Sequence, residues 1–312
     1  MGNQLGLRTQ LMQPPHSVIC DQRSHLFNDE AGMTSILSQA QLIPIMADLS
    51  KRAYLILEDI APRIVPDNGD VHTAPTRVIA LENTIWGKIV PPEELRRIFD
   101  YAHERGIKVH LDGARLWNAC YPQSTYDSTS EEAANTARSL LQDYCSLCDT
   151  VTLCFSKSLG APCGSILLSN DASTIARARH FRKALGGGMR QTGILAAPAR
   201  VAVDDIFLSG VELPKANARA KDLQTYWKSL GGQTQAGVGQ ETNIIWLDLD
   251  SSGIEIGDFK RIGREEGVKL NHRLVVHHRK SDLSHGYHSL SRFLRLLHLM
   301  PGPSVRPYRF AG

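Results

Sequence analysis

Five short apolar runs, each five or six residues long and bounded by Gly, Pro or polar clusters, lie within residues 17–169. They cover residues 17–21, 77–82, 108–112, 150–155 and 164–169. Apolar runs that are nearly continuous, rather than alternating with polar residues, are typical of strands buried on both faces. We therefore expect these five segments to be strands of a central sheet.

Helical patterns separate several of these runs. In 92–106, Leu95, Ile98, Phe99 and Ala102 follow one another at helical spacing, after two acidic residues and before Gly106. Acidic residues favour the first turn of a helix, and glycine favours its end. Further helices are expected over 130–145 and 175–185. Alternating strands and helices predict an α/β fold with a mostly parallel, doubly wound sheet.

The pattern changes after about residue 205, where it indicates a smaller α+β domain. Helices are expected over 213–230 and 259–266, and strands over 243–249, 268–270 and 273–277. A chain of 312 residues has a prior of about two domains. We therefore divide it into a major domain, residues 1–208, and a small domain, residues 209–312.

Composition narrows the classes of protein to consider. Apolar residues make up 42% and the formal net charge is +3, which argues against disorder and against a nucleic-acid binder. No apolar run approaches the length of a membrane span, and six irregularly spaced cysteines form no disulfide framework. The basic residues of the 175–185 segment fit a solvated face, a phosphate contact or a subunit contact better than nucleic acid. We expect a reduced, cytoplasmic protein.

Chemically useful side chains follow the predicted strands directly. His25, Glu82, Asp112 and Lys157 each lie within a few residues of a strand end, and Arg115 follows Asp112 by three positions. Ligands of open α/β sheets bind beyond the carboxyl ends of the strands. The sequence therefore predicts a site at this edge of the sheet.

Lys157 and Asp112 are the most informative pair. A lysine between an apolar strand and a loop of small residues is partly desolvated, which lowers the pKa of its amine and favours Schiff-base chemistry. A carboxylate at a neighbouring strand end suits the nitrogen of a pyridoxal phosphate ring. The alternatives are a surface lysine at a strand end and a turn or helix-capping acid at Asp112.

Three longer motifs carry a resemblance to a known family. They are HLDGARLWNA at 110–119, CFSKSLGAPCGS at 154–165 and LGGGMRQTGILAA at 185–197, with shorter matches at 24–32 and 81–84. In this order the chain resembles the threonine aldolases over roughly residues 1–280. The resemblance implies pyridoxal phosphate as the cofactor and the fold of aspartate aminotransferase.

The resemblance also implies roles for single residues. Lys157 resembles the lysine that binds the cofactor covalently, Asp112 the acid that pairs with the pyridine nitrogen, and His25 the histidine that stacks on the ring and has been considered as a base. Arg115 resembles an arginine near the cofactor and the substrate carboxylate. Arg273 resembles the arginine that clamps that carboxylate, as a bidentate guanidinium does well.

Arg190, in GGGMRQ, is a further candidate for an anion contact; the alternative is a purely structural glycine-rich turn.

Cys145 and Cys148 form a CxxC motif without a second cysteine pair, so ordinary part-buried cysteines are expected there. Histidines at 272, 277, 278, 285 and 288 follow no ligand spacing, and we expect no metal site.

The implied activity is cleavage of L-threonine or a related β-hydroxy-α-amino acid to glycine and an aldehyde, with a small amino acid as substrate and a homodimer or homotetramer as the assembly. An alanine-type racemase remains open, because it needs the same lysine and acid. A truncated, inactive paralogue also remains open. Family members have a longer amino-terminal segment with a phosphate-binding turn before the position of Met1, and the segment after His278 departs from their pattern, with a helix expected at 289–299.

Overall fold

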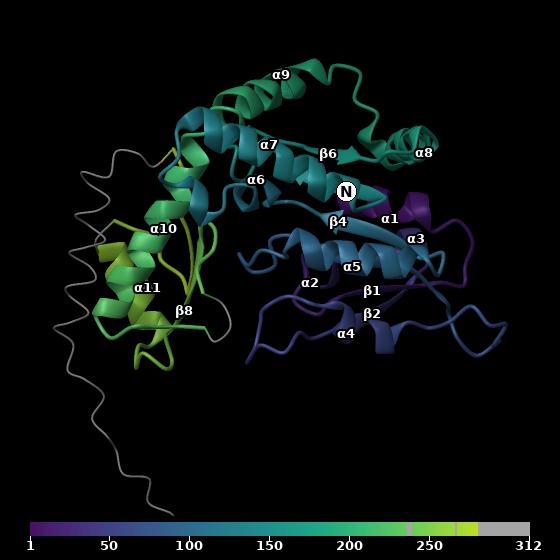
Figure 1. The fold of residues 1–312 in the computed structure, drawn as a ribbon, viewed down its shortest axis with the longest axis horizontal. Coiled ribbons are helices and arrows are strands. Elements are labelled where there is room, and N and C mark those ends of the chain that lie inside the picture. The colour runs from purple at the N-terminus through teal and green to yellow at the C-terminus, as the bar shows by residue number, and fades with distance from the viewer. Residues whose placement is uncertain (236–238, 266, 280–312) are drawn as a thin grey trace, which may run out of the picture.

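A six-stranded sheet forms the centre of the computed structural model, which describes residues 1–235, 239–265 and 267–279 (Figure 1). The strand order is β2-β1-β3-β4-β5-β6, and only the β5–β6 pair is antiparallel. The strands are β1 Ser17–Asp21, β2 Gln41–Ile45, β3 Thr76–Glu82, β4 Lys108–Asp112, β5 Thr150–Cys154 and β6 Ser165–Leu168. The prediction of a mostly parallel sheet is confirmed.

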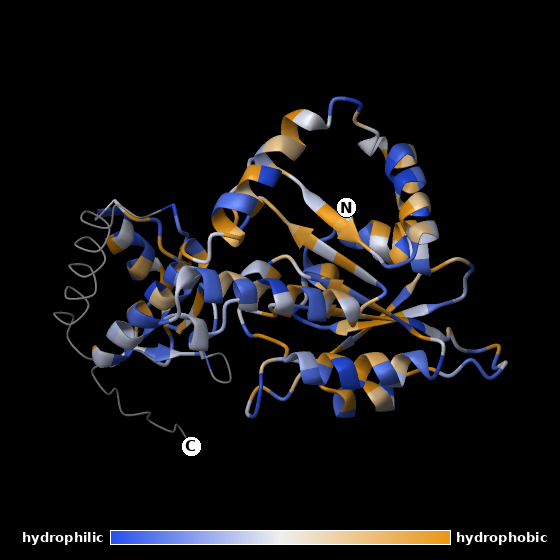
Figure 2. Ribbon diagram, turned by 45° about the horizontal axis from the view of Figure 1, so that its top comes forward, coloured by the Kyte–Doolittle hydropathy of each residue, from blue (hydrophilic) through white to orange (hydrophobic). Residues whose placement is uncertain are grey.

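Helices cover both faces of this sheet. They are α1 Gly2–Gln10, α2 His25–Asn28, α3 Met33–Ser38, α4 Leu57–Ile60, α5 Pro92–His103, α6 Leu116–Ala119, α7 Ser130–Ser146, α8 Ala172–Arg182 and α9 Gly193–Ala202. Helices α5 and α7 pack on the face formed by Ile19, Ile79 and Val109, whereas α1 packs on the opposite face against Val18 and Val78. Successive strand residues thus alternate between two apolar cores, and the strands are orange in the hydropathy view (Figure 2).

Local sequence explains where the longer helices begin. Pro92 opens α5 with Glu93 and Glu94 in its first turn. Thr129 and Glu132 form a capping box at α7, and the Asp171 side chain accepts from two amides of α8. Helices α5, α7 and α8 begin within three residues of their predicted starts.

A second, smaller sheet lies beside the first and has the antiparallel order β7-β8-β9. Its elements are β7 Gln233–Thr234, β8 Ile244–Asp248 and β9 Arg273–Val275, with α10 Glu212–Ser229 and α11 Ile256–Glu265 packed on it. Asn217 of α10 also hydrogen-bonds to Asn118 and Tyr121 of the first part. Helix α10 therefore contacts both parts, and the division at 208/209 stays a prediction.

Three expectations about the strands need correction. β6 is a half-exposed antiparallel edge strand rather than a strand buried on both faces. Residues 268–270 form no strand, and β9 ends at Val275 rather than at His277. The pattern also missed β2, a half-exposed edge strand that contains Pro44, and proline in a run argues against a strand.

The predicted helix at 289–299, with His285 and His288, lies outside the described residues. In the part of the chain that the structure describes, every helix is too short or too polar to span a membrane.

Candidate active site

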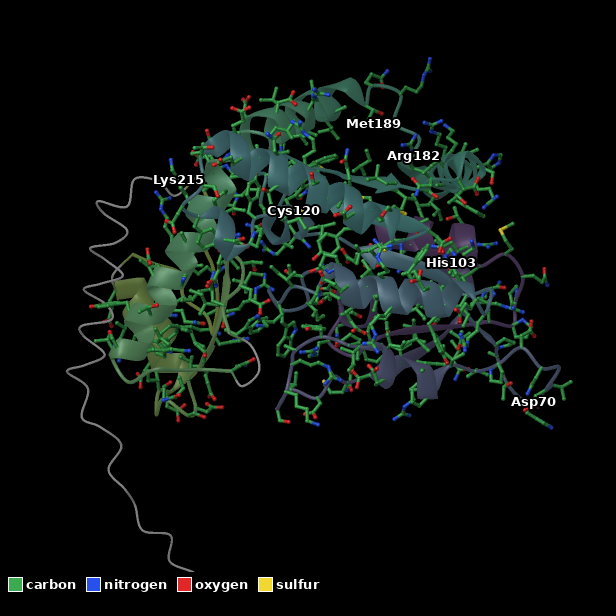
Figure 3. All side chains as sticks on the ribbon, in the orientation of Figure 1. Asp70, His103, Cys120, Arg182, Met189 and Lys215 are labelled. Atoms are coloured by element: carbon green, nitrogen blue, oxygen red, sulfur yellow. The ribbon has the colours of Figure 1, made fainter. Side chains whose placement is uncertain are left out.

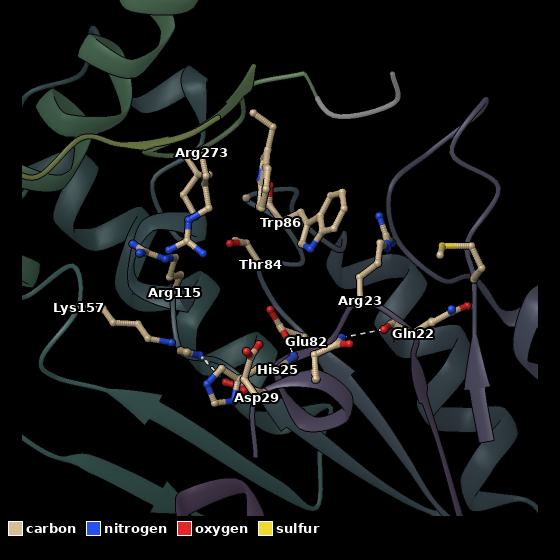
Figure 4. A pocket seen from close by; sticks show the side chains of 17 residues that line it. Gln22, Arg23, His25, Asp29, Glu82, Thr84, Trp86, Arg115, Lys157 and Arg273 are labelled. Carbon is tan, nitrogen blue, oxygen red and sulfur yellow. Dashed lines mark hydrogen bonds between the residues drawn. The ribbon is translucent and has the colours of Figure 1, made fainter. Parts of the chain in front are cut away.

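A cavity of about 410 Å³ opens at the carboxyl ends of β1, β3 and β4. Five of the predicted site residues line it, namely Lys157, Asp112, Arg115, His25 and Arg273. Figure 4 shows Arg273 and Arg115 on one side of the cavity, with Lys157 and His25 below them. The structure therefore brings together residues that lie up to 248 positions apart in the sequence.

Two carboxylates stand side by side at the floor of this cavity. Glu82 and Asp112 end neighbouring strands and are register partners. Asp112 is 6% exposed and accepts hydrogen bonds from the Ala114 amide at 2.9 Å and from Asn3 Nδ2 at 2.6 Å. Glu82 Oε2 accepts from the His25 amide at 2.7 Å. Among the described residues, neither Glu82 nor Asp112 forms an ion pair with a Lys, Arg or His side chain.

This arrangement changes the proton affinity of Glu82. Burial, followed by the negative charge of Asp112, raises the pKa of Glu82 to about 8. A carboxylate that is desolvated beside another carboxylate is expected to hold its proton more tightly. At neutral pH Glu82 therefore holds a proton in the cofactor-free chain, and a cation bound beside these two groups would favour its ionised form.

Lys157 lies in the loop between β5 and β6. The loop is closed by hydrogen bonds from the Phe155 amide to Gly164 O and from the Ala161 amide to Phe155 O, both 3.0 Å. His277 Nε2 donates to the Lys157 carbonyl at 3.0 Å, which connects the segment after β9 to this loop. The backbone of Lys157 is thus fixed from two sides while its side chain extends toward His25 (Figure 4).

His25 begins α2 and is held by a carboxylate. Its Nδ1 donates to Glu30 Oε1 at 2.9 Å. Burial alone would raise the pKa of Glu30, but hydrogen bonds from Gln4, Asn3 and His25 lower it below its ordinary value. An ionised Glu30 places the imidazole proton on Nδ1 and leaves Nε2 as the basic nitrogen.

Ligand atoms of His25, Glu30 and Asp112 lie within 4.8 Å of one another, close enough to hold a metal ion. However, Asn3 Nδ2 already donates to both carboxylates, at 2.7 Å to Glu30 and 2.6 Å to Asp112. A hydrogen-bond network explains this cluster, and the absence of a metal stays a prediction.

Arg115 and Arg273 form the cationic wall of the cavity, and their side chains lie next to each other (Figure 4). Burial, followed by the charge of Arg273, lowers the pKa of Arg115 to about 10. Neither guanidinium forms an ion pair within the described residues, and Arg115 has only a long contact of 3.5 Å to Ser158 Oγ. Two adjacent guanidinium groups without a carboxylate partner are suited to an anion.

Two tryptophans support this wall. Trp86 and Trp246 stack with ring centroids 4.6 Å apart, and Trp246 Nε1 donates to the Trp86 carbonyl at 2.8 Å. Arg273 Cζ lies 5.8 Å from the Trp246 ring centroid, and Arg23 Cζ lies 5.2 Å from that of Trp86. The stack connects the loop after β3 to the small sheet that carries Arg273.

Arg190 is not among the residues that line the cavity. It lies in the exposed turn between α8 and α9. Within a single chain the structure therefore gives Arg190 no contact with the site, and its role in anion binding stays a prediction.

Cys145 and Cys148 form no disulfide, and burial raises the pKa of both thiols, that of Cys145 to about 11.

Sequence reasoning assigned no role to Glu82, Glu30, Asn3 or Trp86. The position of Glu82 at a strand end was a visible signal. Asn3 and Glu30 reach the site through the packing of α1 and of the turn before α3, which no local pattern indicates. Trp86 could be found only from its contact with β8.

The chain is similar to known proteins over most of its length. A family model described as beta-eliminating lyase matches residues 1–250. The low-specificity L-threonine aldolase of Candida albicans is 41% identical over 287 residues, which are 91% of this chain and 71% of that enzyme. The alanine racemase TOXG of Cochliobolus carbonum is 40% identical over 284 residues, which are 89% of this chain and 68% of that protein. The predicted resemblance is confirmed.

The fold has the same relatives. The structure of Leishmania major threonine aldolase superposes with a TM-score of 0.71 at 20% identity, covering 95% of this chain and 82% of that one. At this level of identity the match concerns the fold alone, and it confirms the predicted fold class.

Proposed function

Because this chain belongs to the beta-eliminating lyase family, we propose that it is a pyridoxal-phosphate-dependent lyase that cleaves L-threonine or a related β-hydroxy-α-amino acid to glycine and an aldehyde. The observation that carries the proposal is the convergence of Lys157, Asp112 and the Arg115–Arg273 pair in one cavity. The identity with the Candida albicans threonine aldolase supports the choice of reaction.

The residues present fit the cofactor. Asp112 is a buried carboxylate without an ion-pair partner among the described residues, and a protonated ring nitrogen would balance its charge. Lys157 would hold the cofactor through Nζ, Asp112 would hold the proton on the ring nitrogen, and His25 would lie against the ring. When bound, pyridoxal phosphate supplies an electron sink for the α-carbon of the amino acid.

Arg115 and Arg273 would bind the substrate carboxylate. The positive charges of the two guanidinium groups repel each other, and burial strengthens this repulsion. An anion bound between them would offset the repulsion and accept a charge-assisted hydrogen bond from each arginine. A carboxylate fixed at this wall, together with an amino group directed toward Lys157, orients the α-carbon. These contacts leave the substrate side chain free to point toward the rest of the cavity.

Lysine labelling tests the proposal. Borohydride reduction in the presence of pyridoxal phosphate should attach the cofactor to Lys157, and Lys157→Ala should lose both the label and threonine cleavage. The matched control is Lys183→Ala, which alters an exposed lysine and should change neither. Labelling that maps to Lys183 or Lys88 would contradict the assignment.

A racemase is the second candidate, because the 40% identity with alanine racemase TOXG covers 89% of this chain. Both reactions would use Lys157 and Asp112. Chiral analysis separates them: incubation with L-alanine should leave its configuration unchanged, whereas incubation with L-threonine should release glycine. Formation of D-alanine without release of glycine would favour the racemase.

We also propose that the protein is a homo-oligomer in the cytoplasm. Apolar side chains are exposed along the α8–α9 segment, including Met189 at 47%, Ile194 at 71% and Val201 at 55%. Figure 3 shows Met189 at the periphery of the molecule, beyond the body of the sheet. Exposed apolar clusters of this kind favour a protein partner. Sedimentation of Ile194→Lys, which should shift toward the monomer, tests the oligomer.

A further inference from the structure

We infer that Glu82 is the catalytic base that takes the proton from the β-hydroxyl group of the substrate. The inference rests on the proposed function and deepens it: it assigns the removal of that proton to Glu82 in place of His25, which the resemblance offered as a base. Glu82 lies at the floor of the cavity, at the end of β3, and its side chain lies between Thr84 and His25 (Figure 4).

The hydrogen bonds of Glu82 leave one oxygen available. Oε2 accepts from the His25 amide at 2.7 Å, which fixes the carboxyl group. Oε1 has no hydrogen-bond partner among the described residues, and no cation pairs with the group there. A fixed carboxylate with one unoccupied oxygen facing a cavity is suited to receive a proton.

The surroundings of Glu82 favour proton uptake. It faces Asp112 on β4, Asp21 on β1, Lys157 in the β5–β6 loop and the amide of His25 on α2. Burial and the two acids raise the pKa of Glu82 to about 8, whereas Lys157 and the His25 amide act in the opposite direction. A general base is most effective when its pKa lies near the working pH, and an unperturbed glutamate is far too acidic.

The proposed step is balanced. Glu82 Oε1 takes the hydroxyl proton, and the O–H electron pair becomes the second bond of the aldehyde carbonyl. The Cα–Cβ bond breaks, and its electron pair stays with Cα. Glu82, now a carboxylic acid, holds one proton, which is the number that Cα needs to become glycine. No other reactant is consumed.

Glu82→Gln separates proton transfer from structure. The glutamine carbonyl can still accept from the His25 amide, but the amide group cannot take a proton. We expect kcat for threonine cleavage to fall by about 10²- to 10⁴-fold with little change in cofactor binding. The matched control is Glu94→Gln. Glu94 also accepts from a backbone amide, that of Leu57 at 2.8 Å, but lies outside the cavity, and its variant should keep wild-type kcat.

Thermal unfolding of the cofactor-free chain gives a second readout. The pKa of Glu82 is raised from its ordinary value of 4.5 to about 8 in the folded chain. Between pH 4.5 and about pH 8 the group ionises more readily in the unfolded chain, so the folded state loses stability as the pH rises through this interval. Glu82→Gln should therefore gain melting temperature relative to wild type across that interval and keep the gain above it. Glu94→Gln should show no such gain.

The outcomes are distinct. Glu82→Gln with wild-type kcat and an unchanged pH profile, in an active wild-type background, overturns the inference alone. If His25→Asn loses activity but Glu82→Gln does not, the imidazole of His25 takes the hydroxyl proton, and the inference about Glu82 is also overturned. A wild-type chain with no lyase activity overturns the proposed function and the inference together. A melting difference that does not grow with pH contradicts the charge environment on which the inference depends.

Discussion

The indoles of Trp86 and Trp246 are stacked 4.6 Å apart and joined by a hydrogen bond from Trp246 Nε1 to the Trp86 carbonyl. Trp86 follows the strand that ends at Glu82, whereas Trp246 lies in β8 beside Arg273 on β9. The pair therefore fixes the distance between the floor of the cavity and the guanidinium that faces it. Binding of the substrate carboxylate should depend on this contact.

Trp246→Phe should raise KM for threonine more than it lowers kcat. The variant loses one hydrogen bond and part of a stacked pair, which together should lower the free energy of unfolding by about 1–2 kcal/mol. Trp227→Phe is the control, because Trp227 Nε1 also donates to a backbone carbonyl, that of Gln233, but lies away from Arg273. Equal KM changes in both variants would show that Trp246 acts only through stability.

Arg273→Lys should raise KM by about 10- to 100-fold, because a lysine replaces a bidentate, charge-assisted contact by a single one. Steady-state kinetics with threonine measures the effect. Arg96→Lys changes an exposed arginine on α5 and should leave KM unchanged. A KM for Arg273→Lys within twofold of wild type would move the carboxylate site to Arg115 alone.

Asp112→Asn should lower kcat by about 10²- to 10³-fold, because the neutral amide no longer holds the ring nitrogen in its protonated form. It also places an amide group against Asn3 Nδ2, so circular dichroism must first show that the variant is folded. Visible absorbance of the bound cofactor should persist at reduced affinity. Full turnover in a folded variant would mean that another acid, Asp21 or Glu82, serves the cofactor.

Gly210→Ala should destabilise the chain by more than about 3 kcal/mol, measured by denaturant unfolding. Gly210 has a φ of +68°, and a Cβ built there would lie 1.9 Å from the Ser130 carbonyl oxygen. Gly231→Ala is the control for backbone strain alone, since its φ is +85° and no atom lies within 4 Å of the added Cβ. That variant should cost about 1–2 kcal/mol. Similar losses for both would contradict the close packing of α7 against Gly210.

Asp149 should stabilise the fold near neutral pH and lose this effect in acid. Burial would raise the pKa of Asp149, but hydrogen bonds from Lys108 Nζ at 2.8 Å, the Val109 amide and His103 lower it below the ordinary 3.8. A carboxyl group whose pKa is lower in the folded than in the unfolded chain stabilises the fold at pH values above its unfolded-state pKa. This stabilisation is lost as the pH falls through the folded-state pKa. Unfolding free energies of wild type and Asp149→Asn should therefore converge below about pH 4. Parallel curves would disprove this role.

The sequence predicts those parts of the site that depend on local order. Lys157 and Asp112 directly follow apolar runs, and parallel strands bring such ends to one edge, so their meeting was foreseeable. Arg273 was placed by resemblance alone, because its arrival depends on how the small sheet docks through Trp246. The proton affinity of Glu82 depends on its register with Asp112, and no pattern within β3 indicates it. β2 was missed because this exposed edge strand contains Pro44 and lacks a continuous apolar run. β6 was predicted to be buried because it has such a run, although it lies half-exposed at the edge of the sheet.

Arg115 belongs to the part of the chain built on the six-stranded sheet, whereas Arg273 belongs to the three-stranded one. An anion bound by both arginines acts as a reversible crosslink between the six-stranded and the three-stranded sheet. Its binding energy should appear as slower amide hydrogen exchange in β8 and β9, which are distant from Lys157 in sequence. Binding of an anion to the cationic wall should therefore be detectable as reduced exchange in the small sheet, which contributes no group to bond cleavage.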